Sequence, residues 1–250
     1  MVWRRLSRDL TTRVHFLFDE LLPPILRDQK WVMSVPLRLF FGQKARLFID
    51  FKEQAARMSE MTTVRLYREV QDVVPQRETD LNAGCVEAIL AHLSGRTALE
   101  VGCGRGYLAQ RMGDRHDVTA LDIVLDPRLL EQIPQVRFVA GNILRLPFPD
   151  GQFDTVVCAH TLEHVLDLCG AVCELRRVAR QRLIIVVPRQ RPYRYTFDLH
   201  LHFFPYPGSL VTALNPGYHS YACRAIGGDL FYFEDRSAQP RVPVDLERVG

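Results

Sequence analysis

The chain lacks the cysteine patterns that mark a disulfide-stabilised secreted domain or a zinc module. Its six cysteines include no CxxC pair, and their spacing gives no disulfide framework. Cys85 and Cys158 lie within apolar patterns, where a buried thiol acts as a small hydrophobic group. We therefore expect reduced thiols and a cytoplasmic location.

Long apolar runs and a strong charge of one sign are also missing. No stretch approaches the ~20 apolar residues that cross a bilayer, and the first residues lack the apolar core of a signal peptide. The net charge is only +3 over 250 residues. Residues 1–57 hold 11 Lys/Arg against 6 Asp/Glu, a surplus of +5 that leaves −2 for the rest. The surplus points mildly to an anionic surface or substrate, although a solvated helical face is the simpler explanation.

Strand and helix patterns alternate from residue 82 to residue 187. Apolar runs predict strands at 97–101, 117–122, 136–140, 154–159 and 183–187, and helical patterns occupy 82–93, 106–112 and 167–180. This alternation predicts a doubly wound α/β fold with a parallel sheet. Two further β-rich runs, 220–226 and 230–234, flank Gly227-Gly228-Asp229 and predict an antiparallel hairpin.

Glycines cluster where the first strand meets its helix. Gly102, Gly104 and Gly106 follow that strand, and Asp122 stands at the carboxyl end of the next one. Glycine allows a sharp turn and the close approach of a ligand. A carboxylate at Asp122 can accept both hydroxyl protons of a ribose, so the pair predicts a nucleoside-type cofactor.

The residues around these glycines discriminate between cofactors. A dinucleotide fingerprint places its third glycine three residues after the second, where this chain has Tyr107. Glu100 precedes the glycines and would repel a pyrophosphate, so a cationic ligand suits it better.

The motif Glu100-x-Gly102-x-Gly104-x-Gly106 resembles the first motif of class I S-adenosylmethionine-dependent methyltransferases. The resemblance spans roughly residues 80–235 and implies a mostly parallel seven-stranded sheet that ends in an antiparallel hairpin. It also implies S-adenosyl-L-methionine as cofactor. The residues that it assigns to this cofactor are Glu100 at the amino group, Gly102, Cys103, Gly104 and Gly106 along the methionine part, Asp122 at the ribose, and Ile123, Asn142 and Ile143 at the adenine.

A second motif follows the fourth predicted strand. His160-Thr161-Leu162-Glu163-His164-Val165 resembles the L-E-H-[VI] stretch of a methyltransferase branch that acts on quinones, lipids, sugars and antibiotics. The resemblance implies that His160 lines the cofactor pocket and that His164 lies near the transferred methyl group. Either could act as a general base; the alternative is that the motif only caps the following helix.

The histidines also raise the question of a metal site. His160 and His164 have helical spacing that can hold zinc, but Glu163 precedes the second histidine instead of following the first. No third ligand has convincing spacing, so we expect no metal site. If residues 195–204 are extended, Asp198, His200 and His202 share one face. That face could line the substrate pocket, or it could be a polar edge of the sheet whose groups are already hydrogen-bonded.

Residues 1–80 carry helical periodicity, interrupted at Pro23-Pro24. We interpret them as a helical cap or lid on a cofactor-binding domain at 81–236, followed by a flexible tail at 237–250. A peripheral membrane contact through basic and aromatic residues is an alternative compatible with the cap.

The sequence thus predicts a methyltransferase that acts by in-line displacement on a small-molecule or cell-envelope acceptor, such as a sugar, lipid or natural product. Arg189, Arg191 and Arg194 could meet an anionic acceptor. Nucleic acid is not expected, because the charge balance is slight and the tetrapeptide of amino-directed DNA methyltransferases is absent. A non-catalytic binding protein of the same fold is the main alternative. An NAD-dependent oxidoreductase is disfavoured by Tyr107 and by the terminal hairpin, and the oligomeric state stays open.

Overall fold

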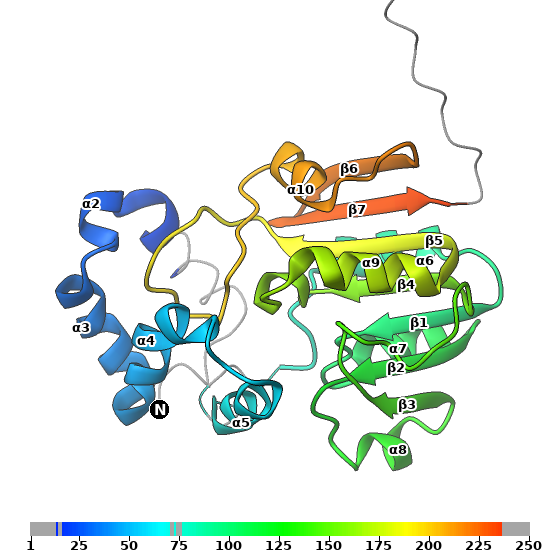
Figure 1. Ribbon diagram of the computed structural model, residues 1–250, viewed down its shortest axis with the longest axis horizontal. Coiled ribbons are helices and arrows are strands. Elements are labelled where there is room, and N and C mark those ends of the chain that lie inside the picture. The colour runs from blue at the N-terminus through cyan, green and yellow to red at the C-terminus, as the bar shows by residue number, and fades with distance from the viewer. Residues whose placement is uncertain (1–13, 15–16, 71–72, 74–76, 237–250) are drawn as a thin grey trace, which may run out of the picture.

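The computed structural model describes residues 14, 17–70, 73 and 77–236. A seven-stranded sheet runs in the order β3-β2-β1-β4-β5-β7-β6 (Figure 1). Its strands are β1 (Thr97–Val101), β2 (Asp117–Asp122), β3 (Val136–Ala140), β4 (Phe153–Ala159), β5 (Ala179–Pro188), β6 (Ser220–Ile226) and β7 (Asp229–Asp235). The first five are parallel, and β7 pairs antiparallel with both β5 and β6. The predicted fold class is confirmed.

Helices cover both faces of the sheet. They are α6 (Ala83–His92), α7 (Tyr107–Gly113), α8 (Leu129–Gln132), α9 (Leu168–Val178) and α10 (Pro207–Leu214). Helices α6 and α7 pack on one face through residues such as Ile89 and Met112. Helices α9 and α10 pack on the other through Leu175 and Leu210. Every residue of β4 is buried, as expected for a strand enclosed on both faces.

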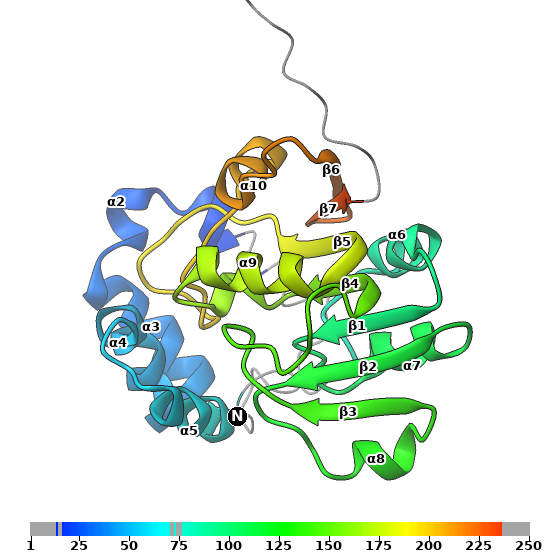
Figure 2. The ribbon, with the colours of Figure 1, turned by 45° about the vertical axis from the view of Figure 1, so that its right-hand side comes forward.

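The N-terminal part forms its own helical layer beside the carboxyl ends of the parallel strands (Figures 1 and 2). It contains a π-helical turn (Leu17–Leu21), α2 (Pro24–Arg27), α3 (Lys30–Phe41), a 3-10 turn (Gly42–Lys44), α4 (Ala45–Ala55) and α5 (Glu60–Val70). We call α2–α5 the N-terminal helices. None of the described helices is long and apolar enough to cross a membrane. The predicted domain boundaries remain a prediction, and the predicted flexible tail at 237–250 lies outside the described residues.

The loop from Arg189 to Tyr206 connects β5 to α10 and packs against the N-terminal helices. Tyr195, Phe197 and Leu199 are buried against α3 and α4, and the ring centroids of Phe197 and Phe18 lie 4.9 Å apart. This loop is not the extended strand that would put Asp198, His200 and His202 on one face; its only β-contact among the described residues is the bridge between Arg189 and Phe204. Its alternating apolar side chains instead anchor the helical layer, because they complete that layer's core.

Candidate functional site

The glycine loop after β1 is shaped by left-handed backbone conformations. Gly102, Gly104 and Gly106 have φ values of 80°, 52° and 75°, which residues with a Cβ rarely adopt. A methyl group added at Gly102 would overlap the side chain of Thr161, whereas one added at Gly104 would meet nothing within 4 Å. The loop is therefore closed by protein at Gly102 and open at Gly104.

Asp122 holds this loop from the end of β2. Its Oδ2 accepts the N–H of Gly104 at 2.8 Å and its Oδ1 accepts the N–H of Val124 at 3.0 Å. Burial raises the pKa of Asp122, and these backbone hydrogen bonds oppose that rise. An ionised carboxylate has about four acceptor positions, so acceptor capacity remains for a ribose hydroxyl group beside the backbone N–H groups of Gly104, Val124 and Ile123.

Glu100 lies beneath the loop and is only 4% exposed. Burial raises its pKa well above the usual range, while a hydrogen bond from the backbone N–H of Ala109 opposes the change. Its Oε2 is buried without any hydrogen-bond partner. A buried carboxylate oxygen without a partner is costly, and a cationic ligand would relieve that cost.

The remaining residues that the sequence assigns to the cofactor are spread around this point. Cys103 is buried on the α6–α7 face of the sheet, so its backbone, not its thiol, is available to a ligand. Ile123 and Ile143 are half-buried beside the ends of β2 and β3. The Oδ1 of Asn142 accepts the N–H of Leu144 at 2.9 Å, which leaves one lone pair for an adenine amino group.

His160 turns away from His164. It adopts a φ of 49°, and its Nε2 lies 3.4 Å from Oδ1 of Asp229 at the start of β7. Asp229 in turn accepts from Asn82 at 2.6 Å, the residue that caps α6. Burial disfavours protonated His160, but Asp229 and the charge of Glu163 outweigh it and raise the pKa of His160 to about 9. This arrangement ties the loop after β4 to α6 and β7.

His164 faces the N-terminal helices. Its Nδ1 lies 2.8 Å from the backbone carbonyl of Leu199, and its ring meets the ring of Tyr67 edge-on, with centroids 6.1 Å apart. Burial raises the pKa of Tyr67, and the charges of Glu163 and Asp122 raise it further. Tyr67 therefore contacts His164 and lies within electrostatic range of the Glu163 and Asp122 carboxylates.

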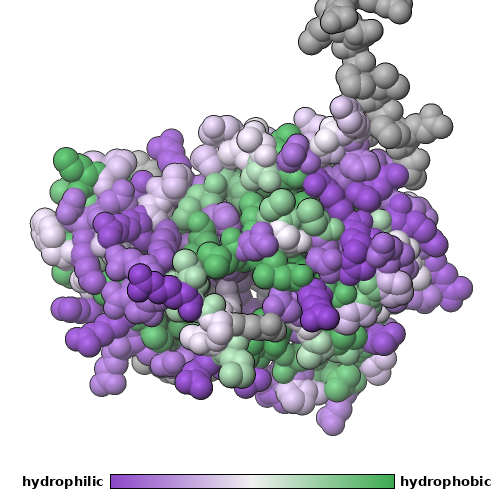
Figure 3. Space-filling view, viewed as in Figure 1, coloured by the Kyte–Doolittle hydropathy of each residue, from purple (hydrophilic) through white to green (hydrophobic). Residues whose placement is uncertain are grey.

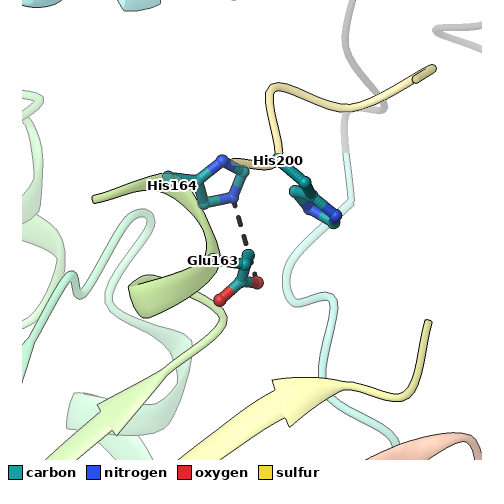
Figure 4. Close-up of side chains that lie close together, drawn as sticks. All are labelled: Glu163, His164 and His200. Atoms are coloured by element: carbon teal, nitrogen blue, oxygen red, sulfur yellow. Dashed lines mark ion pairs between the residues drawn. The ribbon is translucent and has the colours of Figure 1, made fainter. Parts of the chain in front are cut away.

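Glu163 lies between the two histidines and is fully buried. Its Oε1 is 3.8 Å from Nδ1 of His160 and 3.9 Å from Nε2 of His164; neither carboxylate oxygen has a hydrogen-bond partner. Its pKa is raised by burial, against the charges of the histidines. The third neighbour is His200, from the Arg189–Tyr206 loop (Figure 4). Glu163, His164 and His200 are called the Glu163 cluster below.

Other sequence candidates do not join this cluster. His202 is held by its Nε2, 2.8 Å from the carbonyl of Val165. Arg189, Arg191 and Arg194 are exposed, and the guanidinium of Arg194 pairs with Glu53 of α4 at 2.8 Å. Sequence reasoning missed Tyr67 and Thr161; Thr161 stands within the second motif, but nothing in the sequence around Tyr67 connects it to the site.

Apolar side chains gather in the middle of one molecular face, next to a hollow between the N-terminal helices and the sheet (Figure 3). A separate hollow of about 500 Å³ lies beside Thr97 and Asp117. Those residues begin β1 and β2, so that hollow lies at the amino ends of the strands, whereas the glycine loop lies at their carboxyl ends. None of the candidate cofactor residues lines it.

Sequence comparisons relate this chain to known methyltransferases. Residues 99–187 match the family model described as a methyltransferase domain. A demethylmenaquinone methyltransferase of Deinococcus radiodurans is 32% identical over 56% of this chain and 63% of its own length. A 2-phytyl-1,4-naphtoquinone methyltransferase of Nostoc punctiforme is 34% identical over 35% of this chain and 43% of its own. The chain thus spans less than two thirds of the length of these relatives.

A solved structure shares the fold. It is 1,6-didemethyltoxoflavin-N1-methyltransferase of Burkholderia thailandensis, with bound 1,6-didemethyltoxoflavin and S-adenosylhomocysteine, at a TM-score of 0.57 and 20% identity over 74% of this chain and 89% of that one. The segment from β1 to β5 therefore matches a methyltransferase domain and has the fold of this solved methyltransferase, as the class I resemblance of the first motif predicts; the L-E-H-[VI] branch stays a prediction.

Proposed function

We propose that this chain transfers a methyl group from S-adenosyl-L-methionine to a small-molecule acceptor. The observation that carries the proposal is the buried, unpartnered Oε2 of Glu100 below an open glycine loop. A dinucleotide would bring a pyrophosphate to this place, whereas S-adenosylmethionine brings an ammonium group that completes the carboxylate. Glu100 selects between the two by charge.

The proposed donor pose follows the carboxyl ends of β1, β2 and β3. The ammonium group pairs with Glu100, the methionine part lies along Gly102–Gly104, and a ribose hydroxyl group donates to Asp122. Ile123 and Ile143 flank the adenine, and Asn142 accepts from its amino group. Methyl transfer is an in-line displacement with a sulfonium leaving group, so this pose mainly has to align the methyl carbon and exclude water.

The acceptor is proposed to lie beside Tyr67 and His164, under the N-terminal helices. His164 is the catalytic candidate that can touch it, since its ring is only partly buried and faces Tyr67. His160 is proposed to act as a positioning residue, because its ring is engaged by Asp229. The apolar surroundings and the quinone-directed relatives favour an apolar acceptor, and a histidine that can act as a base suits an acceptor that carries a hydroxyl group. The anionic acceptor remains a weaker prediction, because Arg194 already pairs with Glu53.

Calorimetry tests the donor proposal directly. S-adenosylhomocysteine should bind the full chain with one site, and NAD should not bind. A folded chain that binds NAD would instead be an oxidoreductase, and one that binds neither would overturn the proposal. Transfer of label from S-adenosylmethionine to a quinone or lipid extract separates an enzyme from a non-catalytic binding protein.

We also propose a peripheral contact with an anionic membrane surface through α2 and α3. Leu21, Ile25, Trp31, Val35 and Leu39 are between 62% and 76% exposed. The last three share one face of α3 at helical spacing, and Arg38 is exposed on the same helix. Aromatic and aliphatic side chains with adjacent basic groups suit a lipid interface.

Flotation tests this contact. The chain should float with vesicles that contain anionic lipid and less with neutral vesicles. The double variant Trp31→Gln/Leu39→Gln should lose flotation, whereas Leu130→Gln, an exposed leucine on α8, should not. Equal flotation of both variants would contradict the assignment of this face.

A further inference from the structure

The Glu163 cluster brings together one carboxylate and two imidazoles from two segments, with Glu163 and His164 in the loop after β4 and His200 in the Arg189–Tyr206 loop. One ligand atom from each of Glu163, His164 and His200 lies within 4.8 Å of the other two. Glu163 is 0% exposed, and both of its carboxylate oxygens lack a hydrogen bond. A fully buried carboxylate without hydrogen bonds is unfavourable, and His160, whose Nδ1 lies 3.8 Å from Oε1, supplies charge but no hydrogen bond.

The two imidazoles are held in the orientation that metal-binding histidines need. Nδ1 of His164 lies 2.8 Å from the carbonyl oxygen of Leu199, and Nδ1 of His200 lies 2.7 Å from Oε1 of Gln190. Both oxygens can only accept, so each Nδ1 carries the proton, and the neutral ring has its lone pair on Nε2. Such outer hydrogen bonds fix the tautomer and the direction of a ligating ring.

We propose that Glu163, His164 and His200 bind one divalent transition-metal ion of the zinc class, through the carboxylate and the two Nε2 atoms. The sequence offers no third ligand at suitable spacing, but the fold supplies His200 from the Arg189–Tyr206 loop (Figure 4). Ligand atoms around a tetrahedral zinc ion are about 3.4 Å apart. The present 3.9 Å between Glu163 and His164 would close by about half an ångström.

The contacts of the neighbouring histidines explain why His160 and His202 are not proposed as ligands of the ion. His160 lies on the other side of Glu163 and is engaged by Asp229. His202 uses its Nε2 on the carbonyl of Val165. The set of two nitrogens and one carboxylate suits zinc, iron, cobalt or nickel better than magnesium or calcium, which prefer oxygen ligands.

This ion site rests on the proposed function for its role, because it lies on the acceptor side beside Tyr67. Three protein ligands leave a coordination position open. An acceptor hydroxyl bound there would lose its proton to water more readily. Its oxygen would then form the bond to the methyl carbon while the electron pair of the methyl–sulfur bond stays on sulfur. The products are the methylated acceptor, S-adenosylhomocysteine and one proton.

The test uses the full chain without a histidine tag, stripped of metal by a chelator. Zn²⁺ titrated by calorimetry should bind with one equivalent per chain, and Co²⁺ should give visible absorption bands. Glu163→Gln and His200→Gln should each weaken Zn²⁺ binding by tenfold or more. His202→Gln is the matched control and should bind Zn²⁺ like the wild type, because that histidine lies outside the cluster.

Several outcomes overturn the site. They are a folded wild type that takes up no Zn²⁺, equal binding by all three variants, and a thiolate-to-Co²⁺ charge-transfer band, which would place the ion at Cys169 and Cys173. If Glu163→Gln does not fold, His200→Gln and X-ray absorption of the wild-type zinc complex decide, with two imidazole ligands expected. Binding of S-adenosylhomocysteine by the same metal-free samples reports on the proposed function separately.

Discussion

The donor half of the site is built within neighbouring loops at the ends of β1, β2 and β3, whereas the acceptor half is assembled from segments far apart in the sequence. In the donor half, Asp122 and the left-handed glycines hold each other within two adjacent loops. In the acceptor half, Tyr67, His164 and His200 arrive from α5, from the loop after β4 and from the Arg189–Tyr206 loop. A half whose backbone conformation is fixed by local hydrogen bonds tolerates little change, whereas side chains contributed by separate segments can change without disturbing that backbone. We therefore expect the residues of the acceptor half to determine which acceptor is methylated.

The sharpest way to break the donor half is Gly102→Ala. The added methyl group overlaps Thr161 and the residue must keep a φ of 80°, so we expect a loss of about 2–5 kcal/mol in the free energy of unfolding and of S-adenosylhomocysteine binding. Urea unfolding and calorimetry measure the two effects.

Gly104→Ala is its matched control. It has a left-handed φ but open space around the added methyl group, so it should cost only about 1 kcal/mol of stability. Equal destabilisation by both variants would show that contact with Thr161 does not limit the loop.

Glu100→Gln tests the charge in the donor half. It removes the partner of the ligand's ammonium group and should weaken S-adenosylhomocysteine by roughly tenfold or more, about 1.5–3 kcal/mol. Stability should be unchanged or higher, because the buried oxygen without a partner becomes neutral. Methylthioadenosine, which lacks the ammonium group, should bind both proteins alike. If Glu100→Gln weakens methylthioadenosine as much as S-adenosylhomocysteine, Glu100 does not bind the ammonium group.

Tyr67→Phe addresses the acceptor half alone. The ring that packs against His164 stays, and only the hydroxyl near Glu163 and Asp122 is lost. We expect kcat/KM for the acceptor to fall by roughly tenfold, about 1.4 kcal/mol, with S-adenosylhomocysteine affinity within twofold of wild type. A parallel loss of cofactor affinity would mean that Tyr67 belongs to the donor half.

The same contrast explains what the sequence could predict. The order of strands and helices from residue 82 to 235 follows from apolar periodicity, and Glu100, Gly102 and Asp122 stand in one short local pattern. Tyr67 and His200 have no such pattern, because their positions depend on how α5 and the Arg189–Tyr206 loop pack. Residues 195–204 look like a strand since Tyr195, Phe197 and Leu199 alternate, yet that alternation fills the core of the N-terminal helices. Tertiary packing, not local propensity, decides these cases.

The smallest expected effect concerns the contact that holds the acceptor half in place. Lys52 of α4 donates to the carbonyl of Tyr193, and its Nζ lies 4.2 Å from the ring centroid of Phe203. Burial, with a smaller effect from the charge of Arg27, lowers the pKa of Lys52 to about 8 against the raising effect of Asp28. The folded state therefore binds fewer protons than the unfolded state between pH 8 and pH 10, so stability should rise with pH in that range.

Solvent screening at this partly exposed site limits the gain to on the order of 1 kcal/mol. Urea unfolding at pH 8 and pH 10 measures it, and Lys52→Met isolates it, because all other titrating groups are common to both proteins. The wild type should gain more stability than the variant over this range. An equal gain would show that Lys52 stays solvated, and the N-terminal helices would then be held to the Arg189–Tyr206 loop by apolar packing and by polar contacts such as the Arg194–Glu53 pair.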